Sequence, residues 1–299
     1  MSTTVADTAV PVRTFLEHPS KPSVRLPALA CDSHVHVFGP VARFPYVPTR
    51  RNTPVEAPKE ALFALHRSMG IERCVIVQSI VHGTDNSVVE DAIQAGGGRY
   101  LGVALVSPDV PDVELSRLAQ AGFRGVRFNF MRHIAGSASV DAVLALTPRL
   151  AAVGMHLQVH FESELVHELT APLQRSSVPV VIDHMGRVDA TLGIEHADFQ
   201  GLMRLLENPN FYVKVSGIDR IDAKAPPAQK YRDGVALAQA LVKRFPERCV
   251  WGTDWPHPNH THIPDDGVLI DALAQIAPTA NALEQLLVRN PQRLYRFAA

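Results

Sequence analysis

Residues 30–37 read ACDSHVHV, residues 58–70 read PKEALFALHRSMG and residues 73–79 read RCVIVQS, and the predicted architecture follows from these three segments. The first and third are short and rich in Val or Ile, which is typical of buried parallel strands. The middle segment places Leu62, Leu65 and Met69 at helical spacing. Together the segments predict a β–α–β unit, because parallel neighbours need a crossover connection.

The same alternation continues to the end of the chain. The predicted strands are residues 30–37, 73–79, 100–107, 123–130, 156–162, 178–186, 211–218 and 248–256. The predicted helices are residues 58–70, 86–97, 112–121, 139–153, 163–175, 197–206, 228–245 and 271–288. A doubly wound open sheet is the competing architecture, but no glycine-rich phosphate loop follows the first strand. Eight strand–helix units therefore predict an α/β fold, a (β/α)₈ TIM barrel.

Composition limits the classes of protein and partner. The 299 residues are 46% hydrophobic, and 29 Lys+Arg face 30 Asp+Glu, for a formal net charge of -1. This balance gives no reason to expect nucleic acid or a membrane as partner, and no apolar run is long enough to cross a bilayer. We expect an N-terminal extension at residues 1–27 and a single barrel domain at residues 28–299. The three scattered cysteines predict buried thiols and a cytoplasmic protein, while the oligomeric state stays open.

Polar residues end several of the predicted strands, and in a parallel barrel these ends meet on one face. His34 and His36 stand two apart on the first strand, so both side chains point the same way. With His160 and Asp254 they form a donor set that suits a divalent ion such as zinc, with manganese as the second choice. Ordinary hydrogen-bonded histidines and a turn-capping Asp254 are the structural alternatives.

His184 and Asp254 are the predicted catalytic residues. Asp254 ends an apolar strand, where a buried carboxylate needs a cation or hydrogen-bond donors, so we expect it to act both as a metal ligand and as the general base. His184 is expected to polarise a carbonyl group, although a satisfied core histidine is the alternative.

Arginines form a second group around the predicted barrel mouth. Arg127 shares the inner face of its strand with Asn129, whereas Arg124 points to the opposite face. Guanidinium groups hold carboxylate or sulfonate groups in two-point contacts, although surface salt bridges are an alternative. The predicted substrate-binding residues are Arg127, Asn129, Arg132, Arg187, Arg220, His82 and His257.

These motifs resemble those of the amidohydrolase superfamily, and in particular the branch of 2-pyrone-4,6-dicarboxylate hydrolase and 4-sulfomuconolactone hydrolase. The resemblance runs from about residue 30 to residue 295. Its carriers are DSHVHVFGP at 32–40, HGTDN at 82–86, RGVRFNF at 124–130, IDHMGR at 182–187, WGTDWPHPN at 251–259, IPDDG at 263–267 and NP at 290–291.

The resemblance implies a lactonase in which Asp254 acts on the hydrolytic water and Arg127 and Arg220 hold carboxylates. The pyrone-dicarboxylate enzymes work without a metal and carry Tyr where this chain has His160. They also differ at Asn52, Ile80 and His133. Neutral imidazole is a good zinc ligand at a pH where tyrosine keeps its proton, so His160 favours a mononuclear metal site.

The resulting hypothesis is metal-dependent hydrolysis of a small anionic lactone in aromatic-compound catabolism, similar to 4-sulfomuconolactone hydrolase. Four alternatives stay open: a metal-independent 2-pyrone-4,6-dicarboxylate hydrolase, a sugar-lactone hydrolase or isomerase, a decarboxylase, and a non-catalytic protein that binds anionic ligands.

Overall fold

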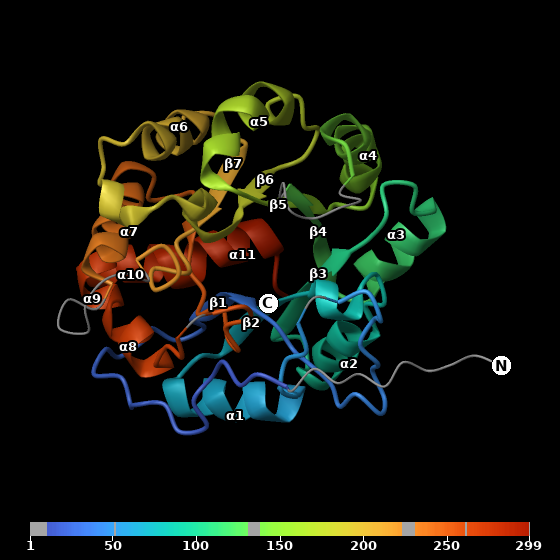
Figure 1. Ribbon diagram of the computed structural model, residues 1–299, viewed down its shortest axis with the longest axis horizontal. Helices are drawn as coiled ribbons and strands as arrows, with labels where there is room; N and C mark the ends of the chain where they lie inside the picture. Colours follow the sequence, from blue (N-terminus) through green and yellow to red (C-terminus); the bar gives the residue numbers. More distant parts are fainter. Residues whose placement is uncertain (1–10, 51, 131–137, 223–230, 261, 299) are drawn as a thin grey trace.

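The computed structural model describes residues 11–50, 52–130, 138–222, 231–260 and 262–298. Eight parallel strands pair in chain order from first to last. They are β1 (Cys31–Val35), β2 (Arg73–Val77), β3 (Tyr100–Leu105), β4 (Phe123–Phe130), β5 (His156–Phe161), β6 (Val180–Ile182), β7 (Phe211–Lys214) and β8 (Cys249–Val250). The predicted (β/α)₈ barrel is confirmed, with the strands at the centre and the helices around them (Figure 1).

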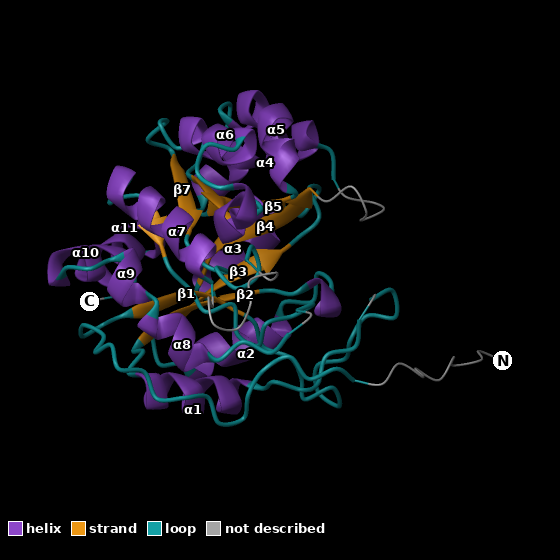
Figure 2. Ribbon diagram, turned by 60° about the vertical axis from the view of Figure 1, so that its left-hand side comes forward, coloured by secondary structure: helices purple, strands orange, loops and turns teal. Residues whose placement is uncertain are grey.

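Helices fill most of the connections between strands, as Figure 2 shows in purple. The outer helices are α1 (Lys59–Met69), α2 (Ser87–Ala95), α3 (Asp112–Gln120), α4 (Val140–Ala152), α5 (Val166–Leu173), α6 (Ala197–Leu205) and α7 (Arg232–Arg244). Four short 3₁₀ turns lie at Ile80–His82, Ser163–Leu165, Asp183–Arg187 and Ala190–Leu192. Among the described residues, no helix is long and apolar enough to cross a membrane.

The C-terminal region differs from the single helix predicted over residues 271–288. It is divided into α8 (Asp266–Asp271), α9 (Leu273–Ile276), α10 (Ala280–Glu284), a π-helical turn (Gln285–Arg289) and α11 (Asn290–Tyr295). Pro278 separates α9 from α10 because it lacks the amide proton that a helix interior needs. The prediction of one continuous helix was therefore wrong.

Two apolar layers hold the barrel. The larger core lies between the strands and the surrounding helices. The smaller one fills the inside of the barrel, where Val75, Val103 and Val181 pack against Tyr295 and Phe297 from the end of the chain. The C-terminal segment thus packs against the interior side chains of the strands, and α11 lies centrally in Figure 1. The three cysteines are free and buried, as predicted.

The predicted N-terminal extension lies along the barrel in its described part. Thr14 donates a hydrogen bond to the carbonyl of Pro256, and the ring of Phe15 packs edge-on against Trp255. Further along, the backbone amide of Ser23 donates to Asp271 at 2.7 Å. Residues 11–27 therefore contact the segment that follows β8.

The last strand, β8, meets the first, β1, along a line of contact that we call the seam. A buried carboxylate stabilises it. Asp32 accepts hydrogen bonds from the backbone amides of His34 and Thr253, both at 3.1 Å, and from the Thr253 hydroxyl at 2.6 Å. Backbone bonds from Ser33 to Trp251 and from Asp254 to His34, both at 2.8 Å, continue the seam.

Gly252 lies in this seam at a point where no side chain fits. A Cβ atom there would lie 2.5 Å from the backbone nitrogen of His34 and 2.9 Å from Oδ1 of Asp32. We expect Gly252→Ala to lower the free energy of unfolding by about 1–3 kcal/mol, because the backbone must move to relieve the overlap. The variant should also lose activity, since His34 and Asp254 would shift.

Urea denaturation and an activity assay check this prediction. Gly97→Ala is the matched control: its φ of +58° costs some stability, but nothing lies within 4 Å of the new atom. If Gly252→Ala and Gly97→Ala lost the same fraction of activity, the close approach of β8 to β1 at Gly252 would not be what positions His34 and Asp254.

Candidate active site

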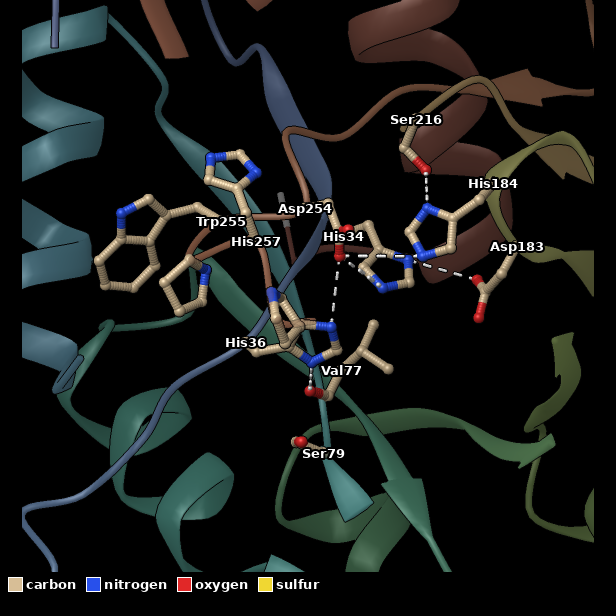
Figure 3. A network of polar contacts seen from close by, with 12 residues as sticks. His34, His36, Val77, Ser79, Asp183, His184, Ser216, Asp254, Trp255 and His257 are labelled. Atoms are coloured by element: carbon tan, nitrogen blue, oxygen red, sulfur yellow. Dashed lines mark hydrogen bonds and ion pairs between the residues drawn. The ribbon is translucent and has the colours of Figure 1, made fainter. Parts of the chain in front are cut away.

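Asp254 lies at the centre of the polar residues that the strand ends bring together (Figure 3). Its Oδ1 atom is 3.4 Å from Nε2 of His36, 3.7 Å from Nε2 of His34 and 3.8 Å from Nε2 of His184. Its other oxygen accepts a hydrogen bond from Arg220 at 2.5 Å. The arrangement places three imidazoles on one side of the carboxylate and one guanidinium on the other.

The surroundings favour the ionised form of Asp254 and the neutral forms of three nearby histidines. Burial opposes ionisation of Asp254, but His184 and Arg220 outweigh it and hold the pKa of the carboxyl well below its ordinary value. Burial, reinforced by Lys214, lowers the pKa of His34 to about 4. Burial also lowers the pKa of His184 and that of His160. These shifts favour a carboxylate at Asp254 beside the neutral forms of His34, His184 and His160.

Partners of the second ring nitrogens orient the histidines. Nδ1 of His36 lies 2.7 Å from the carbonyl of Val77, which can only accept, so this nitrogen carries a proton and Nε2 is the nitrogen that faces Asp254. Nδ1 of His184 bonds to the hydroxyl of Ser216 at 3.0 Å. Because a hydroxyl can donate or accept, His184 is free to present either a lone pair or an N–H at Nε2.

The donor set fits one divalent ion. Ligand atoms of His34, His184 and Asp254 all lie within 4.8 Å of one another. Nε2 of His34 and Oδ1 of Asp254 are buried without a hydrogen-bond partner among the described residues, which is costly unless a cation or proton satisfies them. His36 is adjacent through its contact with Asp254. The residues that could hold a metal are therefore these three, with His36 beside them.

His160 belongs to the same region but not to this closest group. Its Nδ1 is 3.0 Å from the side-chain oxygen of Asn129, and its ring centre is 5.6 Å from that of His184. Nε2 is buried and has no hydrogen-bond partner among the described residues. The predicted ligand thus lies next to His184, and the structure brings His184 rather than His160 into the closest set.

Asp183 is a second buried carboxylate, deeper in the barrel, and it anchors cations instead of facing the cavity. It accepts from Nε of Arg127 at 2.8 Å and from Gln158 at 3.1 Å. Nζ of Lys214 lies 3.6 Å away, and Nδ1 of His34 lies 3.3 Å away. Burial lowers the pKa of Lys214 to about 8, although Asp183 opposes that shift. The contacts with Asp183 therefore hold the side chains of Arg127 and His34 in place.

A cavity of about 700 Å³ opens above these groups. Among the described lining residues, four are arginines, namely Arg50, Arg127, Arg187 and Arg220, and one, Asp254, is a carboxylate. Arg187 has no carboxylate within ion-pair distance in the part of the chain that the structure describes. Because positive charge exceeds negative charge, the cavity suits an anionic ligand.

The backbone is constrained at the two predicted catalytic residues. His184 has a φ of 47° and Asp254 a φ of 68°, both in the left-handed region that non-glycine residues seldom adopt. Such conformations cost free energy and concentrate at functional sites. They turn both side chains toward the same point at the ends of β6 and β8.

Most of the predicted site residues surround this cavity. The lining includes His36, His160, His184, Asp254, Asn129, Arg127, Arg187 and Arg220, and His34 lies directly beneath through its contact with Asp254. Arg124 faces away and bonds to the carbonyl of Ala119, as predicted. Arg132 and His133 lie outside the described residues.

Two predicted substrate-binding residues do not line the cavity. The ring of His82 packs against Tyr46, and its Nδ1 is 3.3 Å from the carbonyl of Pro45. His257 is fully buried and pairs with Asp266 at 3.1 Å. Their surroundings hold both rings away from the space above Asp254.

Three residues of the network were missed at the sequence level. Lys214 is buried at the end of β7, where a lysine in the apolar run FYVK was the available signal. Ser216 and Gln158 gave no comparable signal, because small polar residues and glutamines near strand ends are common.

Comparisons with known proteins place the chain in a family. Residues 31–297 match the model of the amidohydrolase family. The chain is 43% identical to a 2-pyrone-4,6-dicarboxylate hydrolase of Comamonas testosteroni, covering 93% of each chain. It is 38% identical to a 4-sulfomuconolactone hydrolase of Hydrogenophaga intermedia, covering 90% of this chain and 89% of the relative.

A solved structure supports the same family assignment. The probable 2-pyrone-4,6-dicarboxylic acid hydrolase of Acinetobacter baumannii, crystallised with citric acid bound, superposes with a TM-score of 0.78 at 28% identity and covers 90% of this chain and 100% of that one. The protein is an amidohydrolase-fold barrel. It belongs to the amidohydrolase family, and the two curated relatives named above are lactone hydrolases.

The anchor at Asp183 yields a stability prediction. Asp183→Asn leaves Arg127 and Lys214 buried without their counter-charge, so we expect the free energy of unfolding to fall by about 3–5 kcal/mol. Urea denaturation measures the change. The matched control is Asp141→Asn, which removes an exposed partner of Arg175 and should cost less than about 1 kcal/mol. Similar losses in both variants would refute the anchoring role.

Proposed function

We propose that the protein hydrolyses a small anionic lactone of aromatic-compound breakdown. The observation that carries this proposal is a buried Asp254 with one oxygen 3.4–3.8 Å from three imidazoles, beside a cavity that four of the described arginines line. The names of the two curated relatives support it, since both are lactone hydrolases. The citric acid held by the Acinetobacter structure is itself a polyanion.

Asp254 supplies the base for the attack of water. As the water oxygen bonds to the lactone carbonyl carbon, its proton passes to a carboxylate oxygen of Asp254. The carbonyl oxygen becomes negative and needs donors, which His184 provides when Ser216 donates to Nδ1 and leaves the proton on Nε2. The acyl–oxygen bond then breaks, and the ring oxygen leaves as an enolate or alkoxide that takes back a proton.

Arginines hold the acidic groups of the substrate. Arg127 is fixed through Nε by Asp183, which leaves its terminal nitrogens for a ligand. Arg220 is held by Asp254 and by the carbonyl of Pro258 at 3.1 Å. Arg187 presents a further cation to the cavity. Two or three carboxylate or sulfonate groups can thus be bound around one reacting carbonyl.

A divalent ion is the second part of the proposal. If His34, His184 and Asp254 held zinc or manganese, Nε2 of His184 would present its lone pair instead of a proton, and the ion would supply the Lewis acid for the lactone carbonyl in place of that N–H. With His160 nearby, the donors favour the 4-sulfomuconolactone hydrolase type. The higher identity to the pyrone-dicarboxylate enzyme favours the metal-independent reaction as second candidate.

A panel of lactones tests the function directly. We expect one of 4-sulfomuconolactone and 2-pyrone-4,6-dicarboxylate to be hydrolysed, followed by ultraviolet absorbance and by product mass. Asp254→Asn should reduce turnover by about 10²–10⁴-fold because it removes the base, while circular dichroism stays unchanged. Arg124→Gln, outside the cavity on the same barrel, is the control with normal turnover. Near-normal turnover of Asp254→Asn would exclude the assigned role.

Metal content separates the two candidate reactions. Elemental mass spectrometry should show that His34→Gln loses one equivalent of metal per chain relative to the wild type. If His160 is a ligand, His160→Tyr loses the same equivalent. No loss in His34→Gln, with turnover unaffected by chelators, would instead favour the pyrone-dicarboxylate reaction without metal.

A further inference from the structure

A second cluster of metal-binding side chains lies beside the active site, where the segments after β7 and β8 meet. Asp219 follows β7, and His257 and His260 follow β8. Their ligand atoms lie within 4.8 Å of one another, and no other such group besides the one around Asp254 occurs in the described ranges. We propose that these three residues bind a divalent ion of the zinc type, at a site separate from Asp254.

His257 is oriented for this role. Its Nε2 lies 3.1 Å from Oδ1 of Asp266, a fully buried carboxylate that can only accept, so Nε2 carries the proton. Nδ1 then keeps its lone pair, and it is buried without a hydrogen-bond partner among the described residues. Metal-ligating histidines typically donate their other N–H to a carboxylate in this way.

In His260, as in His257, one ring nitrogen bonds to an oxygen acceptor and the other faces the cluster. Here the acceptor is a backbone carbonyl. Its Nδ1 lies 2.9 Å from the carbonyl of His257. The nitrogen NH2 of Arg220 is also near, at 3.2 Å, but its two hydrogens are taken by Asp254 and by the carbonyl of Pro258. Nδ1 of His260 is therefore the donor to His257, and Nε2 presents its lone pair to the cluster.

Asp219 completes the set. It is fully buried, and neither of its oxygens has a hydrogen-bond partner among the described residues. Oδ2 lies 2.6 Å from Nε2 of His260. A carboxylate oxygen and an imidazole lone pair repel each other at this distance unless a proton lies between them. A metal ion with bonds of about 2.0–2.1 Å would replace that proton and move the two atoms apart. A proton shared by the two is the alternative that the experiment must exclude.

Charge and ligand type favour a transition metal. Asp219 and Asp266 bring two buried negative charges, and the nearby Arg220 is already paired with Asp254, so a divalent cation balances the cluster. Imidazole donors favour zinc over magnesium or calcium. Nε2 of His262 lies 3.6 Å from Oδ2 of Asp219, outside the closest group, and could provide a fourth donor if its ring moves toward the ion. Four protein ligands are typical of a structural site without an open position.

An ion here would connect the segments that carry Arg220 and Asp254. Asp219 precedes Arg220, and His257 follows Asp254 by three residues. Binding would hold the guanidinium against the catalytic carboxylate, so this site has a positioning role. It is distinct from a two-metal catalytic centre, because no residue is shared between the two groups.

Zinc stoichiometry tests the proposal on the full chain. The protein is stripped with a chelator, loaded with zinc alone, desalted and analysed by elemental mass spectrometry. Asp219→Asn combined with His260→Gln should lose one zinc per chain relative to the wild type. His34→Gln combined with His184→Gln should keep that zinc. His167→Gln is the matched control, since His167 also pairs with an aspartate, at 3.0 Å, but is exposed and belongs to no such group.

The outcomes separate this site from the proposed function. If the wild type binds two zinc ions and each double variant binds one, both sites exist. If the wild type binds one zinc that only the Asp219/His260 variant loses, the second site stands and the metal-dependent reaction fails. Zinc content unchanged by the Asp219/His260 substitutions, or no zinc bound at all, overturns the proposal and identifies the cluster as proton-sharing pairs.

Cobalt gives a second, spectroscopic readout of the same cluster. In the His34/His184 double variant, bound cobalt should show the visible absorption bands of a tetrahedral site. His257→Gln added to that background should abolish them. Absence of such bands in the double variant, with its circular dichroism intact, would also overturn the proposal.

Discussion

The site geometry depends on the seam where the last strand of the barrel meets the first. Asp32 bonds to the backbone of both sides, and Gly252 lets them approach more closely than a side chain would permit. His34 and His36 leave this seam on one side and Asp254 on the other. Catalysis depends strongly on the distances between the reacting groups. The hydrogen bonds of the buried Asp32 carboxylate therefore help to set the distances between Asp254 and the two histidines of β1.

Two other buried aspartates show how environment divides their roles. Asp183 is surrounded by Arg127, Gln158 and Lys214 and faces no cavity, so its charge serves to hold cations in place. Asp254 is bound by Arg220 through one oxygen only, and its other oxygen faces histidines at 3.4 Å or more. The same functional group is therefore an anchor in one place and a candidate base in the other, because of the two only Asp254 lines the cavity.

Much of the fold and part of the site could be predicted, and the failures have physical causes. Eight apolar runs separated by helical spacers identify the barrel, since parallel strands require crossovers. The helix predicted over residues 271–288 failed because Pro278 interrupts it. Lys214 was missed because its burial depends on Asp183, which lies far away in the sequence. That His257 binds substrate stays a prediction, and the structure pairs its ring with the buried Asp266.

The sequence by itself determined the barrel, the polar residues at its strand ends and the excess of arginine near them. These features depend on periodicity and residue type, which are local properties of the chain. The tertiary structure alone decided which groups meet: His184 rather than His160 in the closest set around Asp254, and Asp219 with His257 and His260 in a second cluster. The reason is that strand register and loop path bring distant residues to within a few ångströms, and no local pattern encodes those distances.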